Sequence, residues 1–340
     1  MKTKLNKTYF NTIIQAIILV LTMVFLYNQL FQKHDADSLF LLLQQTLSKK
    51  NLVLVSVVLL LVPLNWFLEA YKWKYLIYKL EKISTADSFK AVLTGISVSM
   101  FLPNRAGDYL GRIFILKNAD RLQAVLSTML GGLAQLLTTL IFGTIAFTVA
   151  LYDFFDMSDS LKLWSYLGIV FAAFIFISGI VFIYLNFSTF SSIIKNISGK
   201  EYPKISKYSQ VFSWYSSKEL LNVLLISIAR YLIFSFQFYL LLIIFNIGIS
   251  YLISMVLIGI IYLMMTVIPT IAMTELGVRG SVSVYVFGYY FERLNLWNGN
   301  LQQSVIAASS LLWIINLGIP ALIGAFFVFK LRFFRNGNGH

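Results

Sequence analysis

The sequence predicts an all-α, polytopic integral membrane protein, a helical bundle that crosses the bilayer several times. Three observations support this class. Of the 340 residues 59% are hydrophobic and only 12% are charged, the mean hydropathy is +0.79, and apolar runs alternate with short basic clusters. A soluble chain carries about a quarter charged residues and cannot cover this much apolar surface. The net charge of +13 does not indicate nucleic acid, because the basic clusters lie between apolar spans, where the positive-inside rule places them.

Missing and rare residue types exclude several chemistries. The chain has no Cys and two His, His34 in a polar segment and His340 at the end. Disulfides, thiol catalysis and thiolate metal sites are therefore excluded, and we expect no imidazole catalysis, no metal site and no cofactor. The sequence contains no nucleotide-binding loop, so uphill transport would require an ion gradient or a partner.

Six apolar runs are each near the ~20 residues that cross ~30 Å of hydrocarbon. Lysine and arginine clusters beside them fall on one side, which predicts that both termini are cytoplasmic. We expect one transmembrane domain over residues 1–335, in the inner membrane of a prokaryote, and a disordered tail over 336–340. The predicted spans are Phe10–Phe31, Leu52–Ala70, Leu122–Tyr152, Leu163–Phe187, Leu220–Phe245 and Ser304–Phe329.

Two further segments are broken by proline and do not fit as single crossings. Asp87–Lys117 is broken at Pro103, and its first arm of about 14 residues, ~21 Å, is short of a full span. A re-entrant hairpin is favoured there over a pair of kinked crossings. Tyr251–Arg293, broken at Pro269, fits a hairpin and two short crossings equally well. The two hairpins would enter from opposite faces, as in inverted repeats around a central site.

Charges gather at the first break. Asp108 and Arg112 are four residues apart, so they share a helix face and can pair. Arg105 would lie at the start of the returning helix, where a phosphate is favoured, and Gly107 permits a tight turn after Pro103. The alternative is an interfacial turn whose arginines reach lipid phosphates without any transport role.

The second proline break is followed by the same residue types: an acid, a glycine and an arginine. Pro269 is followed by Glu275, Gly277 and Arg279, and the acid again precedes the arginine by four residues. We interpret Pro269 and Gly277 as hinge positions. The alternative is a buried ion pair that only holds helices together.

Single polar residues inside the spans add further candidates. Arg230 would lie ~15 Å deep in its span, so it must face a partner or water. Gln237 lies on roughly the same face, and the two could line a polar path. Glu69, with Lys72 beside it, is interpreted as a simple interfacial pair. The glycines at 131 and 132 indicate close helix packing.

These motifs resemble a known family. Pro103–Arg112 is similar to the proline, arginine, glycine, acid, arginine signature of the lysylphosphatidylglycerol synthase transmembrane family, also called flippase-like. Pro269–Gly280 resembles its second signature, and the resemblance runs from Leu5 to about Phe334. This chain departs from the pattern in carrying Thr274-Glu275 where many members have two glycines, and Gly280 where many have an acid.

The resemblance implies a module that moves a lipid across the bilayer or helps to present it. In the multiple peptide resistance factor this module translocates aminoacylated phosphatidylglycerol. That protein also has a soluble aminoacyltransferase domain. We expect none here, because only Asn336–His340 follow the last basic cluster, and we therefore expect no synthase activity.

We therefore expect a translocase whose partner is a membrane lipid with an anionic headgroup. Arg105, Arg112 and Arg279 would bind phosphate, while Asp108 and Glu275 would hold these arginines or contact a cationic headgroup. An envelope-synthesis enzyme is a second candidate partner. Two alternatives remain: a transferase that uses a polyprenyl-phosphate donor, with one of the two acids as base, and a non-catalytic scaffold for envelope synthesis.

Overall fold

The structure is a computed structural model that describes residues 49–100, 106–154, 160–189, 206, 208–270 and 272–328. The span predicted at Phe10–Phe31, the motif residues Pro103 and Arg105, and the tail 336–340 lie outside the described residues. Within those ranges the regular elements are helices, and five helical stretches are long and apolar enough to cross a membrane. The prediction of an all-helical membrane bundle is confirmed.

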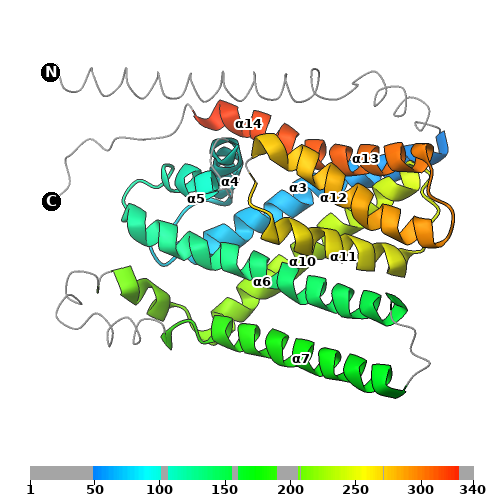
Figure 1. Cartoon of the computed structure of the whole chain (residues 1–340). Helices are drawn as coiled ribbons and strands as arrows, with labels where there is room; N and C mark the ends of the chain where they lie inside the picture. The colour runs from blue at the N-terminus through cyan, green and yellow to red at the C-terminus, as the bar shows by residue number, and fades with distance from the viewer. Residues whose placement is uncertain are drawn as a thin grey trace.

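The helices are numbered in chain order in Figure 1. Their bounds are α3 (Lys49–Ile77), α4 (Thr85–Ser99), α5 (Ala106–Ile113), α6 (Arg121–Phe154), α7 (Ser160–Leu185), the short η4 (Gln210–Trp214), α10 (Ser217–Ile244), α11 (Tyr251–Val267), α12 (Ala272–Arg293), α13 (Gly299–Trp313), the π-helical turn η5 (Ile314–Gly318) and α14 (Ile319–Val328).

One helix is longer than the span predicted for it. The span predicted to end at Ala70 continues as α3 to Ile77, because Lys72 is buried inside the bundle and does not mark an exit to water. The last apolar stretch, Gly299–Phe327, combines α13, η5 and α14.

Side chains at the helix ends explain where several helices begin and end. Ser84 caps α4 by accepting from the Asp87 backbone N–H, and Ser216 and Glu219 form a capping box at α10. Such caps satisfy N–H groups that have no partner within the helix. Asn246 and Asn295, both with positive φ, follow α10 and α12, and asparagine tolerates this left-handed conformation.

The predicted first hairpin consists of two tightly packed helices. A Cβ on Gly111 of α5 would lie 2.6 Å from the Cα of Gly95 in α4, and one on Gly107 would collide with the Val98 backbone. Helix backbones approach this closely only where side chains are absent. The eight residues of α5 span only ~12 Å, less than half of the hydrocarbon thickness.

The centre of the bundle is formed by α3, α6 and α10. The α4–α5 pair packs beside α3 together with α14, and α11 lies along α6. In Figure 1 the α4–α5 pair and the α12–α13 pair lie at opposite ends of α3. Helix α7 lies outside α6, and most of its apolar surface is not covered by the rest of the described chain. This arrangement leaves the central helices facing one another around a polar interior.

Candidate functional site

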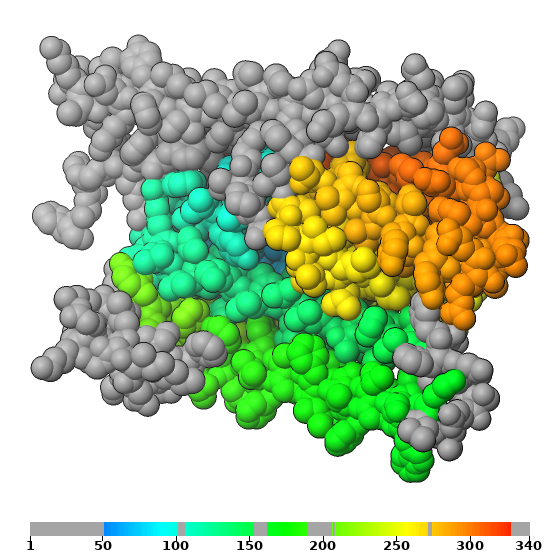
Figure 2. Space-filling view, in the orientation of Figure 1, coloured from blue at the N-terminus to red at the C-terminus, as the bar shows by residue number. Residues whose placement is uncertain are grey.

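A cavity of about 610 Å³ lies among α3, α5, α6, α10, α11, α12 and η5. In Figure 2 the surface is hollowed between α6 and the yellow α12, and blue atoms of α3 are visible at its base. The described residues that line the cavity include four cationic and three acidic side chains: Lys72, Arg112, Arg230, Arg279, Glu69, Asp108 and Glu275.

Glu69 of α3 is the centre of the larger charged group, which we call the Glu69 cluster: Glu69, Lys72, Asp108, Arg112 and Arg230. The Glu69 carboxylate lies 2.8 Å from Lys72 Nζ and 2.7 Å from Arg112 Nη1, and it also pairs with Arg230 Nη1. Its side chain is only 7% exposed. One buried carboxylate is therefore shared by three cations from three helices.

Arg112 of α5 lies between two carboxylates. Its Nε donates to Asp108 Oδ1 over 2.8 Å and its Nη2 pairs with Asp108 Oδ2, while Nη1 donates to Glu69. The two-pronged contact with Asp108 uses the planar fork of the guanidinium, which strengthens and orients the pair. Asp108 keeps a 26% exposed side chain, so the cluster faces the cavity on this side.

Neutral groups complete the surroundings of the other two cations. Arg230 Nε donates to the Asn65 carbonyl oxygen at 3.2 Å and to its Oδ1 at 3.0 Å, and Nη1 donates to Gln135 Oε1 at 3.0 Å. Its guanidinium carbon lies 5.5 Å from the Trp66 ring centroid. Lys72 Nζ donates to the Gly131 carbonyl and to Ser227 Oγ.

Burial explains why these charges are so fully paired. Removing an ion from water costs several kcal/mol, and only close partners and hydrogen bonds compensate for it. The Glu69 cluster nonetheless contains three cations and two carboxylates. It retains one positive charge in excess.

A second ion pair lies on the other side of the cavity. Arg279 Nη2 donates to Glu275 Oε1 at 2.9 Å within α12, and both side chains are at most 8% exposed. The Arg279 guanidinium carbon lies 5.9 Å from the Phe234 ring centroid. Arg279 Nε and Nη1 are buried and have no hydrogen-bond partner among the described residues. Nε and Nη1 are therefore donors without a partner, and we call them the open edge of Arg279.

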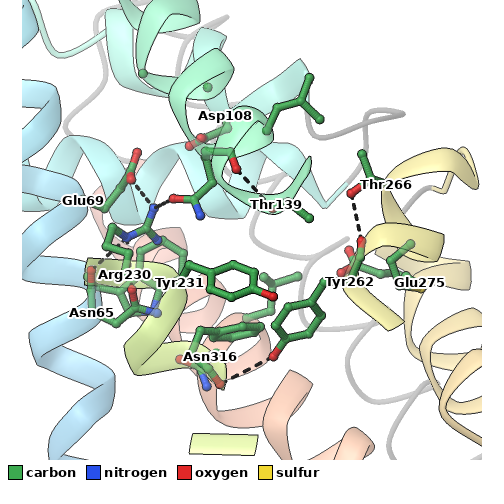
Figure 3. A pocket seen from close by; sticks show the side chains of 18 of the residues that line it. Asn65, Glu69, Asp108, Thr139, Arg230, Tyr231, Tyr262, Thr266, Glu275 and Asn316 are labelled. Atoms are coloured by element: carbon green, nitrogen blue, oxygen red, sulfur yellow. Dashed lines mark hydrogen bonds and ion pairs between the residues drawn. The ribbon is translucent and has the colours of Figure 1, made fainter. Parts of the chain in front are cut away.

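Aromatic side chains separate the two charged groups. Figure 3 places Tyr231 and Tyr262 between Arg230 on one side and Glu275 on the other. The two tyrosine rings meet edge to face with centroids 5.7 Å apart, and Phe142 stacks on Tyr231 at 4.6 Å. Tyr262 also packs against Phe234. The cavity thus has two polar ends with a tyrosine partition between them.

The structure brings most of the predicted site residues to this one cavity. Asp108, Arg112, Arg230, Glu275 and Arg279 all line it. The two proline-broken motifs therefore meet around a common space, although they are far apart in the chain. The sixth candidate, Arg105, lies outside the described residues.

The predicted hinge residues have different positions. Gly107 occupies the first turn of α5 against α4, and Pro269 lies in the exposed link between α11 and α12. Gly277 lies inside the continuous helix α12 with open space beside it, and its role as a hinge stays a prediction. Nothing in its surroundings requires a glycine there.

Two interpretations of single residues also need correction. Gln237 is fully buried and donates to the Val58 carbonyl, and it is not among the residues that line the cavity with Arg230. Glu69 is not a simple interfacial pair with Lys72, because Arg112 and Arg230 reach the same carboxylate. A signal for Glu69 did exist. Asn65, Glu69 and Lys72 recur at helical spacing on one face of α3.

No metal site forms in the part of the chain that the structure describes, where no three His, Asp or Glu side chains come together. The acids of the cavity are instead paired with cations.

Fold and site thus define a class: a polytopic helical membrane protein with a charged cavity between broken helix pairs. Residues 12–324 match the lysylphosphatidylglycerol synthase TM region, and the chain belongs to this family. No curated protein and no solved structure matches it.

Proposed function

We propose that this protein moves a phosphate-bearing lipid across the membrane, with the headgroup in the charged cavity and the acyl chains in the bilayer. The observation that carries the proposal is the Glu69 cluster, a set of buried ions with one positive charge in excess inside a cavity of about 610 Å³. Family membership supports a role in lipid modification or translocation, and the cavity favours translocation.

The chemistry of the cavity suits a phosphate. Ionisable groups at membrane depth are costly and usually serve a substrate path. Arg112 and Arg230 reach the cavity from two helices, and guanidinium groups bind phosphate oxygens through two parallel hydrogen bonds. The volume falls within the range of ~300–1,000 Å³ typical of small-molecule sites, which is enough for a headgroup. Each carboxylate holds an arginine in place until a phosphate competes for it.

The rim of the cavity suits the rest of the lipid. Leu136 and Thr266 line the cavity and are also exposed, so the space reaches the molecular surface between α6 and α11. Apolar side chains such as Met265 and Leu317 continue the lining. On our proposal the α4–α5 pair is re-entrant, the two broken pairs approach from opposite faces, and each supplies one ion pair to the headgroup path.

A flip assay in liposomes tests this function. Phosphatidylethanolamine liposomes carry the full chain and a trace of acyl-labelled fluorescent phosphatidylglycerol, and dithionite quenches the outer leaflet. We expect the protein to accelerate loss of the protected fluorescence, and Arg230→Gln to slow it at least tenfold. Arg293→Gln, at the exposed end of α12, is the control. A rate equal to that of protein-free liposomes would reject the translocase.

The same liposomes test the transferase. Labelled lipid is extracted after the assay and separated by chromatography. A translocase returns it unchanged, whereas a transferase yields a new labelled product when a polyprenyl-phosphate donor is added. Product formation without flipping would replace our proposal by the enzyme.

A further inference from the structure

The acids that line the cavity already have cationic partners. Glu69 accepts from Lys72 and two arginines, and Asp108 accepts from Arg112 through both oxygens. Glu275 pairs with Arg279. An ammonium group on a ligand would therefore have to displace a protein cation before it could reach a carboxylate of the cavity.

The unpaired groups are mainly donors. Arg279 Nε, Arg279 Nη1 and Trp66 Nε1 are buried without a hydrogen-bond partner among the described residues, and both side chains line the cavity. Leaving a buried donor without a partner is energetically costly, so native proteins rarely leave one without a ligand or water. One lining acceptor, Asn316 Oδ1, is also unpaired, but this neutral amide accepts from a hydroxyl as readily as from an ammonium.

The net charge of the cavity favours the same kind of ligand as its unpaired donors. Four cations and three acids line the described cavity, which leaves one positive charge in excess. At the low effective dielectric of a buried site this excess attracts an anion and repels a cation over several ångströms. Two independent features, unpaired donors and net charge, therefore favour the same kind of ligand.

We infer that the cavity selects a headgroup that is anionic overall, and that the open edge of Arg279 binds its phosphate oxygens. A headgroup that carries an added ammonium, as in a lysylated lipid, binds more weakly. This inference rests on the proposed function and adds specificity to it. The excess positive charge of the Glu69 cluster attracts the anion, and Trp66 Nε1 is a second hydrogen-bond donor. The Phe234 ring lies against the guanidinium of Arg279.

A binding measurement on the full chain in dodecyl maltoside micelles tests the inference. Water-soluble dihexanoyl phosphatidylglycerol is titrated, and its affinity is compared with those of dihexanoyl lysylphosphatidylglycerol and inorganic phosphate. We expect phosphatidylglycerol to bind at least tenfold more tightly than the lysylated lipid. Equal or tighter binding of the lysylated lipid overturns the inference. Phosphate binding as tight as that of the lipid would assign the site to a free anion and overturn the lipid assignment.

Variants at Arg279 locate the contact. Arg279→Lys retains a cation beside Glu275 but has no second edge, so we expect phosphatidylglycerol affinity to fall about tenfold. Arg293→Lys, on the exposed end of the same helix, should bind as the parent does. The double variant Glu275→Gln/Arg279→Gln removes both charges of the pair, so it should fold and bind phosphatidylglycerol more weakly, with a reduced preference for the anionic lipid that the excess charge of the Glu69 cluster still supports. An unchanged preference in the double variant contradicts the assignment.

The binding measurement in micelles and the flip assay in liposomes test the inference and the proposed function separately. Micelles have no second leaflet, so they report headgroup binding alone. Selective binding without flipping would reject the translocase function but not the inferred headgroup preference. Flipping without headgroup preference would remove only the inference.

Discussion

Glu69 draws on three helices for its partners. Lys72 is on its own helix α3, Arg112 comes from α5 and Arg230 from α10. Each of these contacts compensates part of the cost of burying the others, so the cluster behaves as one unit. The effect of substituting each member therefore depends on the net charge that the substitution leaves in the cluster.

We predict that Glu69→Gln is strongly destabilising. The substitution leaves three buried cations with Asp108 as their remaining carboxylate in the cluster, and breaking a buried pair by removing one partner costs about 3–5 kcal/mol. Thermal unfolding in detergent should show a clear fall in Tm. Glu292→Gln, at the exposed end of α12, is the control, and an equal Tm for both variants would show that Glu69 is not the electrostatic centre.

Lys72→Met should be less destabilising than Glu69→Gln. Its loss makes the Glu69 cluster neutral while Glu69 keeps two arginines, and methionine conserves most of the buried volume. We expect a smaller fall in Tm than for Glu69→Gln, together with an affinity for anionic lipid that is several-fold lower because the excess charge is gone. Titration in micelles measures this, and unchanged affinity would exclude the field as a source of binding.

At the scale of elements, α5 is too short to position itself. It has eight residues, and isolated helices of this length are not stable. Its position comes from its contact with α4, where Gly95 of α4 and Gly107 and Gly111 of α5 allow the two backbones to touch. Arg112 directly follows Gly111, so this contact sets the place of the guanidinium.

Gly111→Ala therefore tests whether helix packing positions the site. The added methyl would meet the Gly95 backbone, and overpacking typically costs about 1–3 kcal/mol. We predict that α5 moves away and that the flip rate falls together with Tm. Gly168→Ala in α7 is a matched control because no atom lies within 4 Å of its new methyl. Equal behaviour of the two variants would mean that the α4–α5 contact does not matter.

At the scale of the whole molecule, segments far apart in the chain share one cavity. Helix α5 supplies Asp108 and Arg112, and α12 supplies Glu275 and Arg279. Helices α3, α6 and α10 lie between these segments. On our proposal this arrangement depends on the α4–α5 pair entering and leaving the membrane on the same side.

Cysteine labelling tests that topology, and the parent chain contains no Cys. Lys82 and Lys117 flank the α4–α5 pair and are exposed. We predict that Lys82→Cys and Lys117→Cys react with an impermeant maleimide from the cytoplasmic side, whereas Asn300→Cys reacts from the other side. Labelling of the two lysine positions from opposite sides would exclude a re-entrant pair.

Local patterns explain which parts of the site could be predicted. The Asp108–Arg112 and Glu275–Arg279 pairs are four residues apart on one helix, so spacing alone predicted them. The Glu69–Lys72 pair was also expected from its spacing of three residues. The convergence of Arg112 and Arg230 on Glu69 was missed, because no local pattern reports contacts between residues 43 and 161 positions apart. The interpretation of Gln237 failed for a related reason, since the Val58 carbonyl to which it donates lies on another helix.

The sequence by itself determined the class of protein, because apolar composition and span length decide whether a chain is stable in lipid or in water. It also determined the helix break at Pro269 and the charge pairs that follow both prolines, which depend on near neighbours. Only the tertiary structure decided that both motifs line one cavity, that Glu69 is shared by three cations and that Arg279 keeps an open edge. Each of these depends on which buried groups meet after the helices have packed, and a buried charge is tolerated only where that packing provides its partners.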